Sequence, residues 1–130
     1  MGKLEKPKGL FVTMSNSSML ADLYELTMAA AYFDNNVPGD AAFELFVRHL
    51  PKNFSYMIAA GLEQALYYLM NLRFTEEQIQ FLKRHPSFRH VSERFFEYLN
   101  SFRFSGDVWA APEGTVLFPG EPLVQVSGSI

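Results

Sequence analysis

The sequence predicts an α+β fold, with a helix and a strand first, a helical middle and a β-rich end. Between residues 61 and 102, apolar side chains recur at the three- and four-residue spacing of amphipathic helices. After Gly106 the pattern changes to short apolar runs separated by turns that contain Pro and Gly, which is typical of strands. Of the 130 residues, 48% are hydrophobic, so we expect one domain with a buried core.

The first helix is predicted over about residues 22–34. Asp22 is suited to its N-cap, and Glu25, three residues later, completes the pattern of a capping box. Residues 1–18 contain many Lys, Pro, Gly and Ser residues and are predicted to form a flexible lead before a domain at 19–130. Four apolar side chains follow the cap at helical spacing: Leu23, Leu26, Ala30 and Phe33.

The alternating pattern of residues 41–48 predicts a strand that ends before Pro51. Arg48 would be its last residue, on the same face as Glu44. Residues 55–59 fit a second strand. Three short strands are predicted after Gly106, at residues 108–111, 115–118 and 123–127.

Three helices are predicted between these strands. The first covers about residues 61–71. The second begins at the capping box of Thr75 and Gln78 and ends near His85, because Pro86 disfavours helical backbone in the residue before it.

The third of these helices is predicted over residues 88–102, with Val91, Phe95, Leu99 and Phe102 on one side. The sequence contains thirteen Phe residues. We expect some of the Phe-rich surface, including Phe95, Phe96 and Phe102, to pack on another domain or a second subunit.

The run Asp-Leu-Tyr-Glu-Leu-Thr-Met-Ala at residues 22–29 resembles the N-terminal region of the nicotinate phosphoribosyltransferase family. The resemblance covers roughly residues 20–130, and the agreement of several segments in one order makes a chance match improbable. The further segments that resemble the family are Phe43–Arg48, Ala60–Glu63, Phe104–Ala110, Pro112–Val116 and Phe118–Leu123.

This resemblance implies a type II phosphoribosyltransferase, whose members are several times longer and carry a large α/β barrel after this region. We therefore expect the chain to be the N-terminal part of a larger enzyme, inactive by itself. The lack of a signal-peptide pattern and of a long apolar segment favours a cytoplasmic location. The implied reaction joins nicotinate to 5-phosphoribosyl 1-diphosphate and gives nicotinate mononucleotide for NAD biosynthesis. In the family, ATP hydrolysis accompanies the reaction, Mg²⁺ attends the diphosphate, and a histidine beyond Ile130 would accept phosphate from ATP.

Two alternatives stay open from the residues alone. The first is a related phosphoribosyltransferase that acts on nicotinamide, because the residues that select the pyridine would lie in the barrel. The second is a stand-alone binding or interaction domain without catalysis. Continuation of the reading frame past Ile130 into a barrel would separate the enzymes from the stand-alone domain.

Tyr24 is the strongest candidate for a substrate contact. A tyrosine in a first helical turn most often packs on its own domain, and only the resemblance reverses that expectation. The matching tyrosine of the family stacks on the pyridine ring of nicotinate, across a homodimer interface and against the partner's barrel. From the residues alone, the ring stands beside the free N–H groups of a helix start, a weak anion site.

Asp22 and Arg48 are the other candidate substrate-binding residues. Asp22 is first of all a helix cap, and the family pattern adds a role in orienting groups near the substrate. Arg48 has two readings: a surface ion pair with Glu44, or a phosphate contact, for which a guanidinium is well suited. The resemblance implies the phosphate contact, because a related arginine at the end of this strand serves phosphate in neighbouring family members.

Composition excludes several classes of function. The net charge is −3, which is not the footprint of a protein that binds nucleic acid or an anionic membrane. No cysteine is present, so thiol catalysis and cysteine metal sites are excluded. The three histidines show no metal-ligand spacing. Glu113, between Pro and Gly, is explained better by a turn than by catalysis, so no catalytic residue or metal site is assigned.

Overall fold

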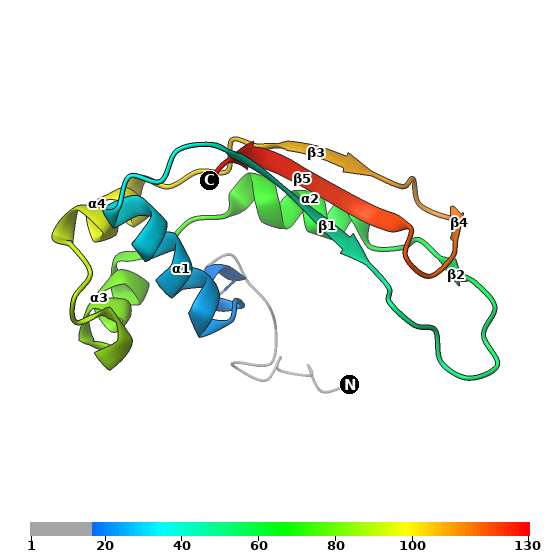
Figure 1. Cartoon of the computed structure of the whole chain (residues 1–130), viewed down its shortest axis with the longest axis horizontal. Helices are drawn as coiled ribbons and strands as arrows, with labels where there is room; N and C mark the ends of the chain where they lie inside the picture. Colours follow the sequence, from blue (N-terminus) through cyan, green and yellow to red (C-terminus); the bar gives the residue numbers. More distant parts are fainter. Residues whose placement is uncertain (1–16) are drawn as a thin grey trace, which may run out of the picture.

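A computed structural model describes residues 17–130. It confirms the predicted α+β class, and no barrel occurs among these residues (Figure 1). The elements are, in chain order, the 3₁₀ helix η1 (Ser17–Met19), α1 (Leu23–Asp34), β1 (Asp40–Phe46), β2 (Met57–Ile58), α2 (Leu62–Asn71), α3 (Glu76–Arg84), the 3₁₀ helix η2 (Pro86–Phe88), α4 (Glu93–Ser101), β3 (Asp107–Ala110), β4 (Val116–Leu117) and β5 (Pro122–Ser129).

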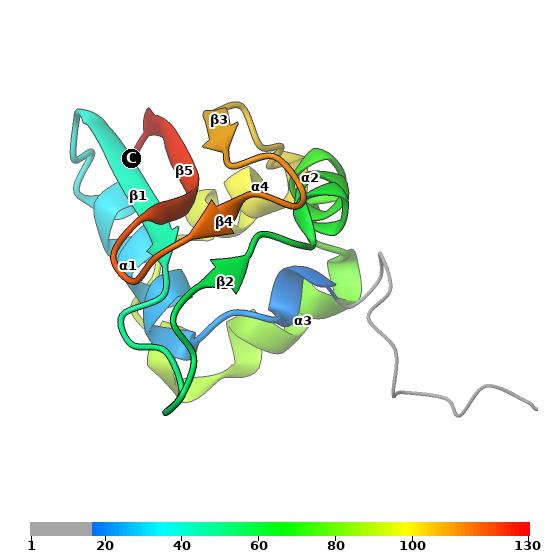
Figure 2. The same ribbon diagram turned by 90° about the vertical axis from the view of Figure 1, so that its right-hand side faces the viewer.

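The strands form two antiparallel sheets. In the larger sheet β5 lies between β1 and β3, and β2 pairs with β4 in a separate short ribbon. Figure 1 shows α1, α3 and α4 gathered at one end of the molecule and the β2–β4 ribbon at the other, with the larger sheet between them. Turned by 90°, Figure 2 shows α2 end-on beside the sheet. The fold therefore consists of a helical end and an elongated sheet.

Gly106, which precedes β3, explains one part of the family-like pattern. A Cβ atom at this position would lie 2.5 Å from the backbone oxygen of Ser127 in β5. No side chain fits there without moving the backbone. The glycine therefore lets the start of β3 approach β5 closely.

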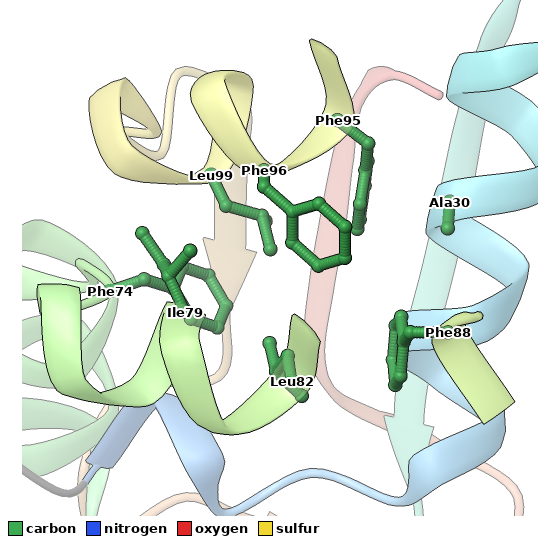
Figure 3. Packing of buried hydrophobic residues seen from close by; sticks show 8 residues of the cluster. All are labelled: Ala30, Phe74, Ile79, Leu82, Phe88, Phe95, Phe96 and Leu99. Atoms are coloured by element: carbon green, nitrogen blue, oxygen red, sulfur yellow. The ribbon is translucent and has the colours of Figure 1, made fainter. Parts of the chain in front are cut away.

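The main hydrophobic core lies in the helical end. Figure 3 shows side chains of α4 directed toward α3, η2 and Ala30 of α1. Leu26 and Phe33 of α1 and Phe102 also pack against this cluster. Its buried members are Ala30, Phe74, Ile79, Leu82, Phe88, Phe95, Phe96 and Leu99.

Ring–ring contacts and side-chain hydrogen bonds join the helices of this core. Phe95 makes edge contacts with Phe33, at 5.7 Å between ring centroids, and with Phe96, at 5.9 Å. At the end of α1, both the hydroxyl and the backbone N–H of Ser92 donate to the Asp34 carboxylate. These hydrogen bonds hold the pKa of Asp34 below its ordinary value. The last turn of α1 is therefore tied to the N-cap of α4.

Three expectations from the sequence are wrong in detail. The last helix begins at Glu93, five residues after the predicted start, because Pro86 opens a 3₁₀ turn and Ser92 caps α4. The first strand ends at Phe46, after a register shift at Leu45, and does not reach Arg48. Phe95 and Phe96 are buried inside this domain, so they do not offer a surface to another one.

Many of the large exposed apolar side chains instead lie on the strands, on α2 and in the loop after β1. Phe43 of β1, an edge strand of the larger sheet, is 70% exposed. Other members of this set are Leu45, Phe54, Tyr67, Met70 and Trp109. On α2, Leu66 and Met70 are exposed.

Of the lead predicted at residues 1–18, only Ser17 and Ser18 fall within the described residues. Both are buried in η1. The hydroxyl of Ser18 donates a hydrogen bond of 2.9 Å to Oε1 of Gln78 in α3. The chain that enters α1 is therefore attached to the helical core.

Candidate functional site

The first turn of α1 has the predicted capping box. Asp22 is the N-cap, and Oε2 of Glu25 accepts the backbone N–H of Asp22 at 3.1 Å. Tyr68 of α2 lies near this turn: burial, together with the negative charge of Glu25, raises the pKa of the Tyr68 phenol. Asp22 thus has the capping role expected first, and its side chain is exposed.

The ring of Tyr24 projects from this turn and is 60% exposed. It does not pack on its own domain as a core residue would. Beside the turn lies a shallow, open depression of about 400 Å³, lined by Met19, Leu20, Ala21, Asp22 and Glu25. Two carboxylates flank the turn, and negative charge there disfavours an anion despite the helix start. The geometry therefore suits Tyr24 for stacking and gives no anion site next to it.

Arg48 lies in the bend that follows β1, and its side chain is exposed. The turn between β4 and β5 holds the backbone of this segment, because Gly120 N–H donates to the carbonyl oxygen of Val47 at 2.9 Å. Glu44 accepts a hydrogen bond from Gln125 at 3.1 Å. Among residues 17–130 the ion pair is between Lys83 and Glu93, and the alternative of an ion pair between Arg48 and Glu44 is not formed.

Tyr24 is in the first turn of α1, and Arg48 follows the last residue of β1 by two positions. Figure 1 shows the start of α1 near the helical end and the end of β1 toward the β2–β4 ribbon. If both residues contact substrates, they do so at different places on one copy of the chain.

Glu113 has a role that reasoning from the sequence missed. Its Oε1 accepts the backbone N–H groups of Gly61 at 2.8 Å and Leu62 at 2.7 Å, and so caps α2 from a turn 52 residues away. Gly61 adopts φ +101°, a conformation that favours glycine. The same turn is joined to Ala59 through backbone hydrogen bonds of Gly114 and Thr115. Two of the family-like segments therefore meet to fix the start of α2.

We expect Glu113→Ala to lower the free energy of unfolding by about 1–2 kcal/mol, because two N–H groups at a helix start lose a charged acceptor. Glu113→Gln keeps an acceptor oxygen and should lose less than half of that. Urea unfolding of the three proteins at one pH measures both differences. Equal stability of all three would show that water replaces the carboxylate at no cost.

The described residues offer no metal centre. Within residues 17–130, no group of three or more His, Cys, Asp and Glu side chains is placed to hold an ion. His85 and His90 make local hydrogen bonds, to Ser87 N–H and Arg89 Nε respectively, as expected of structural histidines. No helix in this part of the chain is both long and apolar enough to cross a membrane.

Comparison with known proteins identifies the family of this chain. Residues 19–130 match the model of the nicotinate phosphoribosyltransferase N-terminal domain. Nicotinate phosphoribosyltransferase pncB2 of Mycobacterium tuberculosis is 46% identical over 113 residues, which are 87% of this chain and 24% of that protein. The nicotinate phosphoribosyltransferase of Mus musculus is 40% identical over 116 residues, or 86% of this chain and 21% of that protein.

Solved structures give the same result. The crystal structure of human nicotinic acid phosphoribosyltransferase superimposes with a TM-score of 0.73 at 39% identity, over 84% of this chain and 22% of that chain. A nicotinate-nucleotide pyrophosphorylase from Pyrococcus furiosus shares the fold, with a TM-score of 0.63 at 17% identity. The chain spans between a fifth and a quarter of the curated relatives it matches. It belongs to the nicotinate phosphoribosyltransferase family, of which it carries the N-terminal domain.

Proposed function

We propose that this domain is part of an enzyme that joins nicotinate to 5-phosphoribosyl 1-diphosphate, giving nicotinate mononucleotide and diphosphate for NAD biosynthesis. The observation that carries the proposal is the family match over residues 19–130. The names of the relatives favour nicotinate over nicotinamide as the pyridine. A stand-alone binding domain is disfavoured, because the relatives are more than four times the length of the matched region.

Within this reaction Tyr24 would stack on the pyridine ring of nicotinate. Its exposure supports this role, since a ring with one free face can accept an offset stack worth about 0.5–1.5 kcal/mol beyond burial. The carboxylate of nicotinate would need a cation from outside this turn, because Asp22 and Glu25 are both acidic. Asp22 would hold the turn that presents the ring.

Arg48 would contact a phosphate group of 5-phosphoribosyl 1-diphosphate. Its guanidinium has no ion-pair partner among residues 17–130, so all of its donors are available to a ligand. The resemblance implies that the matching tyrosine reaches the partner's barrel across a homodimer interface. We therefore propose a homodimer in which Tyr24 reaches a neighbouring subunit.

Mg²⁺ and ATP are implied by the resemblance alone. The described residues do not fit a metal site, because no set of three candidate ligands comes together among them. We therefore assign no step of the reaction to a metal or nucleotide held by this domain. The contribution proposed for it is to bind and orient the two substrates, which lowers the barrier by positioning.

The proposal is tested in the complete polypeptide that carries these residues. Arg48→Ala should raise KM for 5-phosphoribosyl 1-diphosphate roughly 10- to 150-fold, the equivalent of one hydrogen bond to a charged group, and leave KM for nicotinate nearly unchanged. Arg48→Lys keeps the charge without the fork and should recover part of the loss. Steady-state formation of nicotinate mononucleotide measures both constants.

Lys52→Ala is the matched control, since it removes one positive charge from the same loop and should change neither constant. Residues 1–130 alone should form no mononucleotide. A small stability change with both KM values intact would assign Arg48 to structure. No mononucleotide from the complete polypeptide with both substrates, ATP and Mg²⁺ would contradict the proposed reaction itself.

A further inference from the structure

We propose that Ser18 is a positioning residue for Tyr24, acting through a buried hydrogen bond that attaches the entrance of α1 to α3. The inference rests on the proposed stacking role of Tyr24 and extends it to a residue outside the depression. Ser18 precedes Tyr24 by six positions and does not line that depression. Its effect on substrate would therefore be transmitted by the backbone.

The hydrogen bond is built into the helical core. Ser18 is 2% exposed and Gln78 is 9% exposed, so water does not compete for either group. Oε1 of Gln78 accepts the Ser18 hydroxyl at 2.9 Å and also the backbone N–H of Thr75 at 2.8 Å. An amide oxygen has two lone pairs, and both are used here. The start of α3 and the segment before α1 thus share one acceptor.

The segment between Ser18 and Tyr24 leaves little freedom. Leu20 N–H donates to Ser17 at 3.0 Å, which closes the turn of η1. Met19 packs partly against the hydrophobic core. The capping box of Asp22 and Glu25 follows at once. Three contacts therefore hold the segment between Ser18 and the first turn of α1, which carries the exposed ring of Tyr24.

The two ends of α1 are held by different contacts. Ser18 and Gln78 hold the entrance, whereas Ser92 holds the last turn through Asp34. The twelve residues of α1 separate these ends by about 18 Å. Loss of one contact should therefore loosen one end only. Ser92 supplies a matched control for Ser18, because both are serines whose hydroxyl joins two helices.

The experiment compares Ser18→Ala with Ser92→Ala in the complete polypeptide. We expect Ser18→Ala to raise KM for nicotinate about 2- to 10-fold, the effect of one buried hydrogen bond. It should leave kcat and KM for 5-phosphoribosyl 1-diphosphate nearly unchanged. Ser92→Ala should lower the thermal midpoint at least as much and leave KM for nicotinate unchanged. Gln78→Met, which removes the acceptor, is the second test if Ser18→Ala does not fold.

Amide hydrogen exchange in the same proteins measures directly which end of α1 is loosened. Amides of residues 20–26 should exchange faster in Ser18→Ala, and those of residues 30–34 should not. In a Tyr24→Ala background, Ser18→Ala should produce no further rise in KM for nicotinate. A rise of equal size with Ser92→Ala, or no rise with Ser18→Ala while Tyr24→Ala is impaired, would overturn the inference. If Tyr24→Ala itself binds nicotinate normally, the stacking role fails instead.

Discussion

Tyr24→Ala is expected to raise KM for nicotinate about 5- to 150-fold in the complete enzyme, a loss of about 1–3 kcal/mol of binding. Tyr24→Phe should be nearly normal, because an offset stack needs the ring and not the hydroxyl. The change should fall mainly on KM if the stack is equally strong in the ground and transition states. Steady-state kinetics with nicotinate varied at saturating 5-phosphoribosyl 1-diphosphate measures it.

Met28→Ala is the control for this prediction. Met28 lies four positions after Tyr24, on the same side of α1, and is 44% exposed. The Met28→Ala substitution removes apolar surface next to Tyr24 without removing an aromatic ring. If Met28→Ala and Tyr24→Ala are equally impaired, the surface of α1 serves contact with another chain and not stacking. If Tyr24→Ala binds nicotinate like the wild type, Tyr24 is only a surface residue.

Phe95→Ala should give the largest change in stability, about 3–5 kcal/mol in the free energy of unfolding. Phe95 is 1% exposed, and its ring makes edge contacts with the rings of Phe33 and Phe96. Its removal would leave a cavity at the junction of α1 and α4. Phe95→Leu keeps much of the volume and should lose less. Urea unfolding at neutral pH provides the comparison.

Phe43→Ala makes the same chemical change at a position that is 70% exposed. It should cost less than about 1 kcal/mol, because Phe43 contributes a cross-strand pair with Val126 and little burial. A cost equal to that of Phe95→Ala would mean that the sheet, not the helical cluster, is the main source of stability. The two variants therefore locate the core by experiment.

Local signals in the sequence predicted several elements well. The capping boxes at Asp22 and Thr75 mark the true starts of α1 and α3, because a cap depends on residues only three positions apart. The start of α4 was missed although Ser92, followed by Glu93, is a helix-start signal of the same kind. The apolar spacing of the preceding residues extended the predicted helix over a 3₁₀ turn. Caps were thus more reliable than periodicity at helix ends.

The candidate site was predictable only in part. The sequence indicated Tyr24, Asp22 and Arg48 through a family-like order of residues, and their roles in binding stay predictions. It did not indicate that the first strand ends before Arg48, or that the start of α1 and the end of β1 lie apart. These features depend on where separate elements come to rest.

The sequence by itself determined the α+β class and most of the elements, because periodicity, caps and turns act over a few neighbouring residues. The family was indicated by the order of several segments that resemble it. Only the tertiary structure decided that Ser18 is anchored to Gln78 and that Glu113 caps α2. These partners are separated by 60 and 52 positions. A polar side chain in a turn has many possible partners. The packing of the helices and strands decides which of them comes within hydrogen-bond distance.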